Sequence, residues 1–558
     1  MENKSSKNRY TVIGFSVIAL VTITVSLVLP SIYVLDDDMT IQSILSGTYL
    51  RPYGYTYYLS GELGILLSFL YRLIPVIPWL GVFMVFVYIL SVGSVLSKTL
   101  AIYEEKKATV FTVILCSIFI YLGFFVPGIM MLHYTVTAAV SAACGMFLLV
   151  ISKEKKDLTC PVVLFLLTYL IRENVFFMSL PFIAVSFLVI LINEKKDGFK
   201  RCKTHILIFG ISFIILFFFN RILPPGEEWD VYKNYNDLRT DVYDYVNIWP
   251  NEEKAVSYYE QNGLDKDTVD FYSSYDIAVA ALSNDNGYEA LEKSEEILGI
   301  FAGYDSVKND GISLYKRAKD AVYTYVFFML EYETMRSYHI FLIGAYVLFI
   351  AVAFMTSNKK MLVIPVLLFG IRSFLWCYLA FAGRYPDRVL ISTLIPEFMI
   401  LISLTALMIS KAKEWKYKNI VLVTATAVFL LIGITGFCDN VTYYKSERER
   451  ITADDSLYLY FSENKDKTFI VDLYSAVNHS VYAIKDYDSS KENYMLGGGW
   501  LTGHPLMMEK TAGLNEEIYF AVKKEYENVP DIIESVTGLS FIPFDEVAER
   551  YLIYKIER

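Results

Sequence analysis

The chain has 558 residues, of which 55% are hydrophobic and 16% aromatic, and its formal net charge is −10 at pH 7. Apolar runs of about 20 residues alternate with short lysine clusters, a pattern that excludes an ordinary soluble enzyme. It indicates a mainly α, polytopic helical membrane protein. The six cysteines show neither a disulfide framework nor the spacing of a metal site.

The hydrophobic runs predict about eleven membrane spans. The first is interpreted as a retained signal anchor because it is too long for a signal peptide and lacks a small-residue cleavage site. The fifth is short, so it and the sixth could form a tight pair or a broken element. The run 62–75 contains Arg72 and ends at Pro75, and we expect a helix lying on the membrane surface there. The predicted spans are 10–34, 79–99, 109–127, 129–151, 158–172, 175–193, 205–223, 338–356, 361–382, 389–410 and 419–437.

The charges are sorted between alternate loops. Residues 223–337 hold 23 acidic against 10 basic residues, residues 438–558 hold 22 against 13, and the loops on the other side are basic. The positive-inside rule therefore predicts a cytoplasmic N-terminus and acidic segments outside a plasma membrane, which we expect to be bacterial. Acidic outer segments argue against nucleic acid as a partner.

The spans divide the chain into four parts. Residues 1–223 form an N-terminal transmembrane module with a first outer loop at 35–78, and residues 224–337 form a large outer helical loop. Residues 338–437 return to the membrane, and residues 438–558 are expected to fold outside as a small α/β domain. In this last part, "TFIVDLYS" and "YLIYKIE" are typical of strands, and we expect a helix over 515–527.

Three consecutive aspartates, Asp36, Asp37 and Asp38, follow the first apolar run. They could simply be a polar stop, because carboxylates are unfavourable in lipid. One aspartate would suffice for that. We expect them to stand at the C-terminal end of the first helix, where the helix dipole disfavours negative charge, and neighbouring carboxylates raise the pKa of one of their number. Such a concentration of negative charge favours a functional role, with a cation, a proton or an acceptor hydroxyl as its partner.

The stretch "LDDDMTIQSILSG", followed by a surface helix and a series of spans with large outer segments, resembles the GT-C membrane glycosyltransferases. The motif match covers the first 100 residues, and the layout match covers the whole chain. The resemblance implies transfer of a sugar from a polyprenyl-phosphate donor to an acceptor on the outer face, with inversion at the anomeric carbon. No WWDYG motif is present, which favours transfer of a single hexose or pentose over transfer of a whole glycan.

A carboxylate suits this chemistry because an acceptor hydroxyl is a poor nucleophile until a base takes its proton. By analogy with the family, Asp36 or Asp37 is the base, and Asp38 orients it or binds a metal. A divalent ion such as Mg²⁺, Mn²⁺ or Ca²⁺ on Asp37 and Asp38 is optional.

The leaving lipid phosphate needs cations, and arginine is suited to phosphate because its planar guanidinium donates two hydrogen bonds at once. Each candidate could instead pair with an acid: Arg172 with the neighbouring Glu173, Arg372 with a partner inside the bundle, Arg384 with Asp387. The four candidate arginines are Arg172, Arg372, Arg384 and Arg388.

Further substrate-binding candidates flank these groups. His133 and Tyr134 begin the fourth span, Glu62 begins the surface helix, and Tyr55 and Tyr57 could stack on a sugar ring. The alternatives are a solvated histidine, a helix-capping glutamate and an interfacial aromatic belt. Two more stretches could contribute: the helix carrying Trp229, Asp237, Arg239 and Asp241 could line the acceptor groove, and "GGGWLTGHP", with Trp500 and His504, has glycines that permit close backbone approach.

The predicted function is therefore an inverting glycosyltransferase of the cell envelope, whose acceptor is a glycan, a glycolipid or a protein. The alternatives are a membrane transporter and a lipid-linked glycan flippase or polymerase. A transporter should show paired, repeated hydropathy, which we do not find, and a polymerase should have a basic long loop, whereas this one is acidic. The sequence identifies neither the sugar nor the acceptor.

Overall fold

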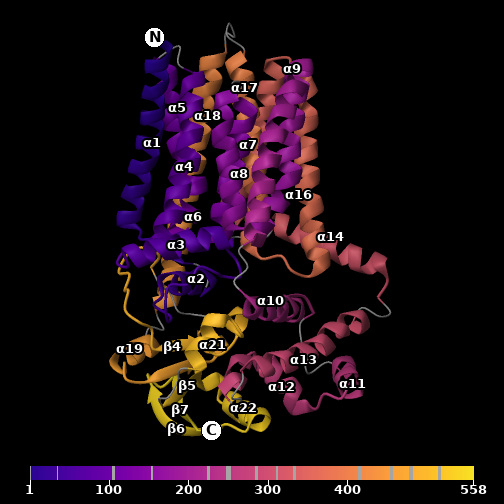
Figure 1. Cartoon of the computed structure of the whole chain (residues 1–558). Helices are drawn as coiled ribbons and strands as arrows, with labels where there is room; N and C mark the ends of the chain where they lie inside the picture. Colours follow the sequence, from indigo (N-terminus) through magenta and orange to yellow (C-terminus); the bar gives the residue numbers. More distant parts are fainter. Residues whose placement is uncertain are drawn as a thin grey trace.

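The computed structural model is mainly helical, with a bundle of long helices at one end and a globular region at the other (Figure 1). The N-terminus lies at the free end of the bundle, and the C-terminus lies in the globular region. The residues that the structure describes are 2–33, 36–103, 107–152, 155–222, 226–246, 253–282, 287–308, 312–330, 335–411, 417–452, 456–476, 482–512 and 517–557.

Among the described residues, nine helical stretches are long and apolar enough to cross a membrane, which makes the chain a multi-pass helical membrane protein. Two shorter apolar helices, α5 (Lys107–Ile120) and α8 (Thr159–Ile171), stand beside them. Every predicted span falls on one of these helices, while the number that cross the membrane stays a prediction. The nine stretches belong to α1 (Glu2–Val28), α4 (Trp79–Ile102), α7 (Tyr134–Ile151), the two halves of α9 (Glu173–Ile222), α15 (Arg336–Met355), α16 (Val363–Ala382), α17 (Asp387–Lys411) and α18 (Lys418–Thr452).

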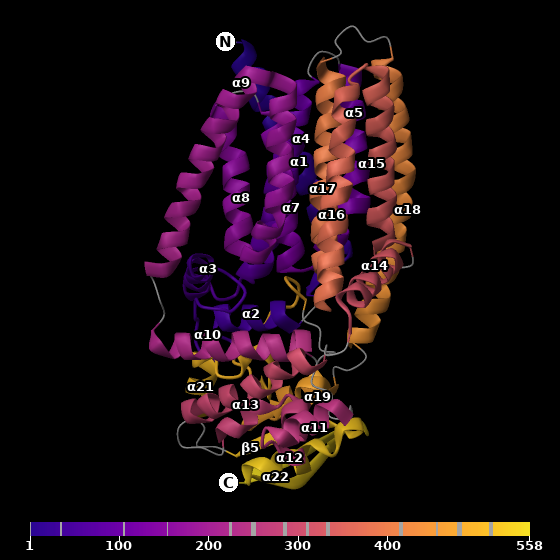
Figure 2. The same cartoon turned by 90° about the vertical axis from the view of Figure 1, so that its right-hand side faces the viewer.

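The predicted sixth and seventh spans belong to the single long element α9. Figure 2 shows its halves as two legs that meet at the end of the bundle near the N-terminus. In the most apolar 18-residue stretch of the second leg, Asp197–Phe218, only 11% of the residues are buried inside the protein, so most of its side chains face outward.

The predicted third and fourth spans are separated by an irregular junction. The helix α5 continues as a π-helical turn, Tyr121–Phe125, and then as the short α6 (Pro127–Met130) and β2 (Met131–Leu132). The strand β2 pairs in parallel with β1 (Ile32–Tyr33). Helix α7 consequently begins at Tyr134 rather than at residue 129, and the segment after α1 is held beside its N-terminus.

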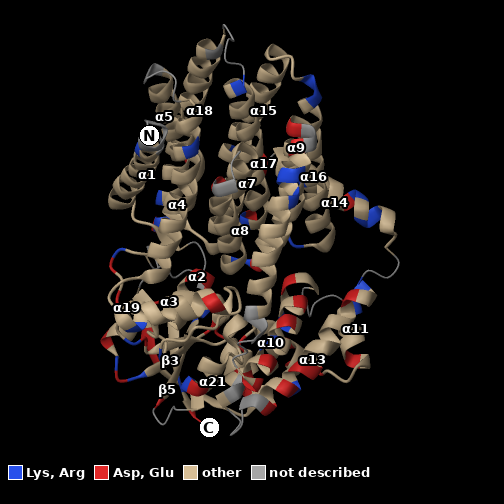
Figure 3. Ribbon diagram, turned by 45° about the horizontal axis from the view of Figure 1, so that its top comes forward, with Lys and Arg blue, Asp and Glu red and all other residues tan. Residues whose placement is uncertain are grey.

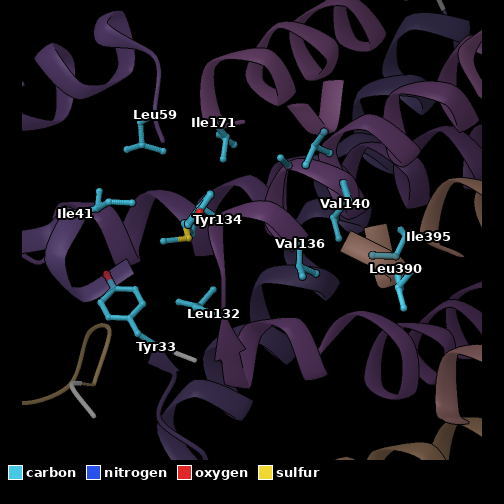
Figure 4. Packing of buried hydrophobic residues seen from close by; sticks show 14 of the residues in the cluster. Tyr33, Ile41, Leu59, Leu132, Tyr134, Val136, Val140, Ile171, Leu390 and Ile395 are labelled. Atoms are coloured by element: carbon cyan, nitrogen blue, oxygen red, sulfur yellow. The ribbon is translucent and has the colours of Figure 1, made fainter. Parts of the chain in front are cut away.

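Helix α7 forms the core of the bundle, because every one of its residues is buried. Small residues on it let α4, α8 and α17 approach closely, as in other membrane helix pairs. A Cβ on Gly145, for example, would lie 2.9 Å from the ring of Phe165. Figure 4 shows Val136 and Val140 of α7 near Leu390 and Ile395 of α17.

The three aspartates do not end a helix; they begin one. Helix α1 ends at Val28, and α2 (Asp36–Ser46) starts with the aspartates as its first turn. The helix dipole therefore favours their charge, which corrects the expectation from the sequence. The surface helix expected over 62–75 is α3 (Gly61–Leu73), which lies across the ends of the spans in Figure 1. It exposes apolar side chains such as Leu66 and Phe69.

The loop between α9 and α15 is helical, as expected. Figure 3 shows acidic residues along its helices α10, α11 and α13. Its last helix, α14, packs on α16 and exposes apolar side chains including Tyr323, Phe327 and Leu330. The elements are α10 (Glu227–Thr240), a π-helical turn (Asp241–Val246), α11 (Glu253–Gln261), α12 (Lys266–Ser274), a 3-10 helix (Ile277–Leu282), α13 (Gly287–Lys308) and α14 (Leu314–Leu330).

The C-terminal part carries a five-stranded sheet of order β4-β3-β5-β7-β6, in which β3 is parallel to β4 and β5 while the other pairs are antiparallel. Helix α18 runs to Thr452, so this part begins later than residue 438. Its elements are α19 (Ser456–Glu463), β3 (Thr468–Val471), α20 (Leu473–Ala476), β4 (Tyr494–Leu496), α21 (Pro505–Ala512), β5 (Ile518–Lys523), α22 (Val529–Thr537), β6 (Ser540–Val547) and β7 (Tyr551–Glu557).

Both strands expected from the sequence, β3 and β7, are confirmed. The helix expected over 515–527 is wrong, because Ile518–Lys523 is strand β5. All six of its residues are buried between β3 and β7, and a strand buried on both faces loses the alternating pattern that would reveal it in the sequence.

Candidate active site

A cavity of about 270 Å³ lies where the end of the bundle, the α9–α15 loop and the C-terminal sheet meet. Its walls come from segments that are hundreds of residues apart in the sequence. One carboxylate from the aspartate triplet and three arginines share this space. The lining residues are Asp37, Thr40, Tyr58, Arg239, Asp244, Tyr275, Arg384, Arg388, Leu473, Leu496, Gly498, Gly499, Trp500 and Leu501.

The sheet meets this cavity through the carboxyl ends of its parallel strands. Leu473 is the second residue after β3, and the glycine run 497–499 follows β4 directly. In open α/β sheets, ligands bind outside the carboxyl ends of the strands, where the connections diverge to opposite sides. The cavity occupies the equivalent position here.

The glycine run permits a close contact with the α9–α15 loop. A Cβ on Gly498 would lie 1.7 Å from the carbonyl oxygen of Tyr275, and one on Gly497 would lie 2.5 Å from Oδ1 of Asp276. Ala278 N–H donates a hydrogen bond of 2.9 Å to the Gly497 carbonyl. Any side chain at residue 498 would therefore force the two walls of the cavity apart.

Asp37 is the member of the aspartate triplet that reaches the cavity. Burial raises the pKa of its carboxyl group, and the positive charges of Arg388, Arg172 and Arg239 and a hydrogen bond from Trp500 oppose that rise. The side chain of Asp36 lies outside the described residues, so its predicted role as an alternative base stays a prediction.

Asp38 is fully buried and faces α7 rather than the cavity. Its Oδ1 accepts a hydrogen bond of 3.0 Å from the Tyr134 N–H, and burial strongly raises its pKa. Its Oδ2 lies 3.8 Å from Nε2 of His133, and neither atom has a hydrogen-bond partner among the described residues. Asp38 thus joins the first turns of α2 and α7.

His133 is the N-cap of α7, and its Nδ1 accepts a hydrogen bond of 2.9 Å from the Thr135 N–H. Burial, Arg388 and Arg172 together lower its pKa well below the usual range, so the ring is neutral. Since Nδ1 is an acceptor, the ring proton resides on Nε2 and is directed toward Asp38. His133 is therefore neither a solvated histidine nor a cavity group.

The arginines at the cavity differ in their partners. Arg384 forms an ion pair with Asp244, and Arg239 donates to Asn236, Thr240 and Tyr275. Among the described residues, Arg388 has no acid within salt-bridge distance, although its charge acts on Asp37. It is the cation that is most available to an incoming anion.

Arg172 lies behind the cavity wall. Its guanidinium is 4.7 Å from the ring centroid of Tyr58 and 5.3 Å from that of Tyr134, and the two rings stack at 5.5 Å. Its charge also acts on Asp37. Arg172 therefore contacts the rings behind the cavity and does not line the cavity itself.

Arg372 is not brought to the cavity. It is buried within the bundle, where its Nε lies 2.6 Å from Oε2 of Glu397 on α17. Glu397 also accepts a hydrogen bond from Tyr346. Because both charges are satisfied inside the bundle, this pair serves helix packing, the alternative that the sequence left open.

The remaining candidates surround the cavity. The Tyr57 hydroxyl donates to Asp237 over 2.7 Å, and the Tyr55 ring lies 5.8 Å from Trp229. Glu62 lies in the first turn of α3, and both of its carboxylate oxygens are buried without a described hydrogen-bond partner. Of these three residues, none lines the cavity itself.

Several cavity residues were not expected from the sequence. Thr40 follows the aspartates on the next turn of α2, and Asp244 and Tyr275 come from the α9–α15 loop. Nothing in the sequence signals Asp244 and Tyr275, because their position depends on how that loop docks. Tyr275 has a left-handed backbone with a φ of 71°, which only the structure reveals.

The cavity does not fit a divalent cation well. Its lining contains three arginines but only two carboxylates, and one of these carboxylates, Asp244, already forms an ion pair with Arg384. Asp38 points toward His133, and the described residues contain no cluster of three His, Cys, Asp or Glu side chains that could hold a metal. The optional metal on Asp37 and Asp38 stays a prediction, and we derive no step through it.

Comparison of the chain with protein-family models, curated proteins and solved structures finds no match. The functional proposal therefore rests on the geometry of the cavity alone.

Proposed function

We propose that the protein is an inverting glycosyltransferase of GT-C type. It would move one sugar from a polyprenyl-phosphate donor to an acceptor hydroxyl of a cell-surface glycan, glycolipid or protein on the outer face of the membrane. The observation that carries this proposal is the position of Asp37 in a cavity lined by Arg239, Arg384 and Arg388, at the end of a membrane bundle.

Asp37 would act as the base. Its carboxylate accepts the proton of the acceptor hydroxyl while the acceptor oxygen forms a bond to the anomeric carbon of the sugar. The bond from that carbon to the phosphate oxygen breaks on the opposite face of the ring. The electron pair stays on the departing polyprenyl phosphate, and the anomeric configuration is inverted.

Arg388 would stabilise the leaving phosphate, because it has no competing acid among the described residues. Arg384 can join it only in part, since Asp244 already neutralises much of its charge. Fixed cations aimed at the developing charge lower the barrier without reorganising during the reaction. Arg239 and Arg172 would keep the pKa of Asp37 from rising further.

A second hollow supports a lipid-linked donor. It has a volume of about 720 Å³, lies between α14 and residues 383–387, and shares Arg384 with the cavity. Tyr323, Phe327 and Phe328 line it. A donor with its phosphate at Arg384 and Arg388 could pass its polyprenyl chain along these rings toward the membrane.

Asp38 and His133 would be positioning residues. Asp38 would fix the first turn of α2 against α7 through its hydrogen bond from the Tyr134 N–H, His133 would support Asp38 from 3.8 Å away, and this contact would set the direction of Asp37. A small displacement of a base from its acceptor costs orders of magnitude in rate, so such support matters for catalysis.

The test is transfer of a labelled hexose or pentose from a panel of polyprenyl-phosphate sugars, with membranes that contain the protein. Asp37→Asn should lower transfer by at least about 100-fold while leaving the folded protein in the membrane. Asp439→Asn, an exposed position on α18, is the matched control. Full transfer by folded Asp37→Asn would refute the assignment, and substrate flux across proteoliposomes without a covalent product would favour a transporter or flippase.

A further inference from the structure

Two buried carboxyl groups face each other behind the cavity wall, outside the machinery described above. Asp276 comes from the α9–α15 loop, and Asp472 follows β3 in the C-terminal sheet. Both are fully buried. They meet where Tyr275, Leu473 and Gly498 line the cavity, so the contact holds two of its walls together.

The hydrogen bonds of the pair leave one oxygen of each group unsatisfied. Oδ1 of Asp276 accepts from the Leu473 N–H over 3.1 Å, and Oδ2 of Asp472 accepts from the N–H and hydroxyl of Ser475. Oδ2 of Asp276 and Oδ1 of Asp472 have no described donor. Leu473, whose N–H donates to Asp276, directly follows Asp472 in the chain, so the two carboxyl groups lie beside each other, and the charge of Asp472 acts on Asp276.

We propose that Asp276 and Asp472 share one proton, which Asp276 carries on Oδ2 and donates to Oδ1 of Asp472. Two ionised carboxylates buried together would repel each other, whereas one proton supplies the donor that both free oxygens lack. The proton is assigned to Asp276 because the N–H and the hydroxyl of Ser475 already donate to Asp472. The pair is then a pH-sensitive latch between the α9–α15 loop and the sheet.

The other titratable groups around the pair do not neutralise it. The phenols of Tyr474 and Tyr526 face it from α20 and from the turn after β5, and Tyr275 adjoins it. Among the described Lys and Arg side chains, none forms a salt bridge with either carboxylate. Burial and the charge of Asp472 accordingly raise the pKa of Asp276 well above its ordinary value.

The sign of the pH effect follows from proton counting. When the α9–α15 loop is docked on the sheet, the pKa of Asp276 is raised. At pH values between the ordinary pKa of an aspartate and this raised pKa, the docked state holds a proton that the undocked state has lost. Docking therefore weakens as pH rises through this interval, by up to about tenfold in its equilibrium constant for each pH unit. Alkaline pH should loosen the wall formed by Tyr275 and Gly498.

Hydrogen–deuterium exchange of the full-length protein in detergent tests the latch without any substrate. The amides of Ala278 and Leu473 each donate across the interface, to Gly497 and Asp276. Their protection factors, corrected for intrinsic exchange, should fall with rising pH in the wild type. In Asp276→Asn the protection factors should not change with pH, because the side-chain amide introduced at residue 276 donates to Asp472 at every pH.

Asp472→Asn is the reciprocal variant and should flatten the pH dependence in the same way, so the test survives if one variant fails to fold. Asp267→Asn, exposed on α12 of the same loop, should behave like the wild type. A wild-type profile as flat as that of Asp276→Asn overturns the proposal. So does protection that Ca²⁺ raises and a chelator lowers, since the pair would then hold a cation. Because no sugar transfer is measured, the result is independent of the proposed function.

Discussion

Oδ1 of Asp38 accepts a hydrogen bond of 3.0 Å from the backbone N–H of Tyr134, 96 residues away. This bond satisfies an N–H in the first turn of α7 that has no partner within its helix, and the second and third aspartates have different surroundings. Asp37 faces the arginine-lined cavity, and Asp38 faces the protein interior. A run of identical residues thereby supplies one side chain to the cavity and one to the buried interior.

Replacement of Asp38 should destabilise the fold. In Asp38→Ala the buried N–H of Tyr134 loses its acceptor, which costs about 1–3 kcal/mol. The thermal unfolding temperature of the purified protein should fall, while Asp439→Ala should leave it unchanged. An Asp38→Ala protein as stable as the wild type would show that water or another group satisfies Tyr134.

The rate of sugar transfer should fall on the acid side. A base must be ionised, and because burial raises the pKa of Asp37, the acid limb should lie above the range of an ordinary aspartate. Arg388 is the largest of the charges that lower this pKa. Arg388→Gln should therefore shift the acid limb to higher pH.

The pH–rate profiles of the wild type and Arg388→Gln, measured with the same donor, check this prediction. Arg450→Gln, an exposed arginine paired with Glu447, is the control and should not move the limb. An acid limb that stays in place in Arg388→Gln would mean that a group other than Asp37 controls it.

A methyl group at Gly498 should break the wall of the cavity. The Cβ of Gly498→Ala would lie 1.7 Å from the Tyr275 carbonyl, so the backbones must separate, at a cost of about 1–3 kcal/mol. Gly299→Ala on α13, where no atom lies within 4 Å, should instead stabilise the protein by about 0.5–1 kcal/mol. Unfolding temperatures that change equally in the two variants would contradict this contact.

The Arg372–Glu397 pair should behave as a structural unit of the bundle. Arg372→Met leaves the buried carboxylate of Glu397 without its counter-charge, which costs about 3–5 kcal/mol. Adding Glu397→Leu removes that carboxylate and should restore most of the unfolding temperature. If the double variant is stable but loses sugar transfer while Asp37 is intact, Arg372 has a function that its packing does not explain.

The sequence alone was sufficient for the membrane bundle, because span length and apolar composition are local properties. The helices that form it, the surface helix α3 and the strands β3 and β7 all followed from local runs. Strand β5 did not, because it is buried on both faces and its sequence therefore lacks the alternation of polar and apolar residues. The direction of the aspartates was also misjudged, since the sequence does not show that α1 stops at Val28 and a new helix starts at Asp36.

The sequence also determined which residues were chemically plausible, but only the tertiary structure decided which of them meet. In the sequence, Arg372 and Arg388 are equally good candidates for binding phosphate. In the structure, Glu397 neutralises Arg372 inside the bundle, whereas Arg388 lies at the cavity, where its charge acts on Asp37. The cavity forms only when the α9–α15 loop docks on the carboxyl ends of β3 and β4. The loop meets the sheet through hydrogen bonds from Leu473 to Asp276 and from Ala278 to Gly497, and no local sequence pattern encodes contacts between residues so far apart in the chain.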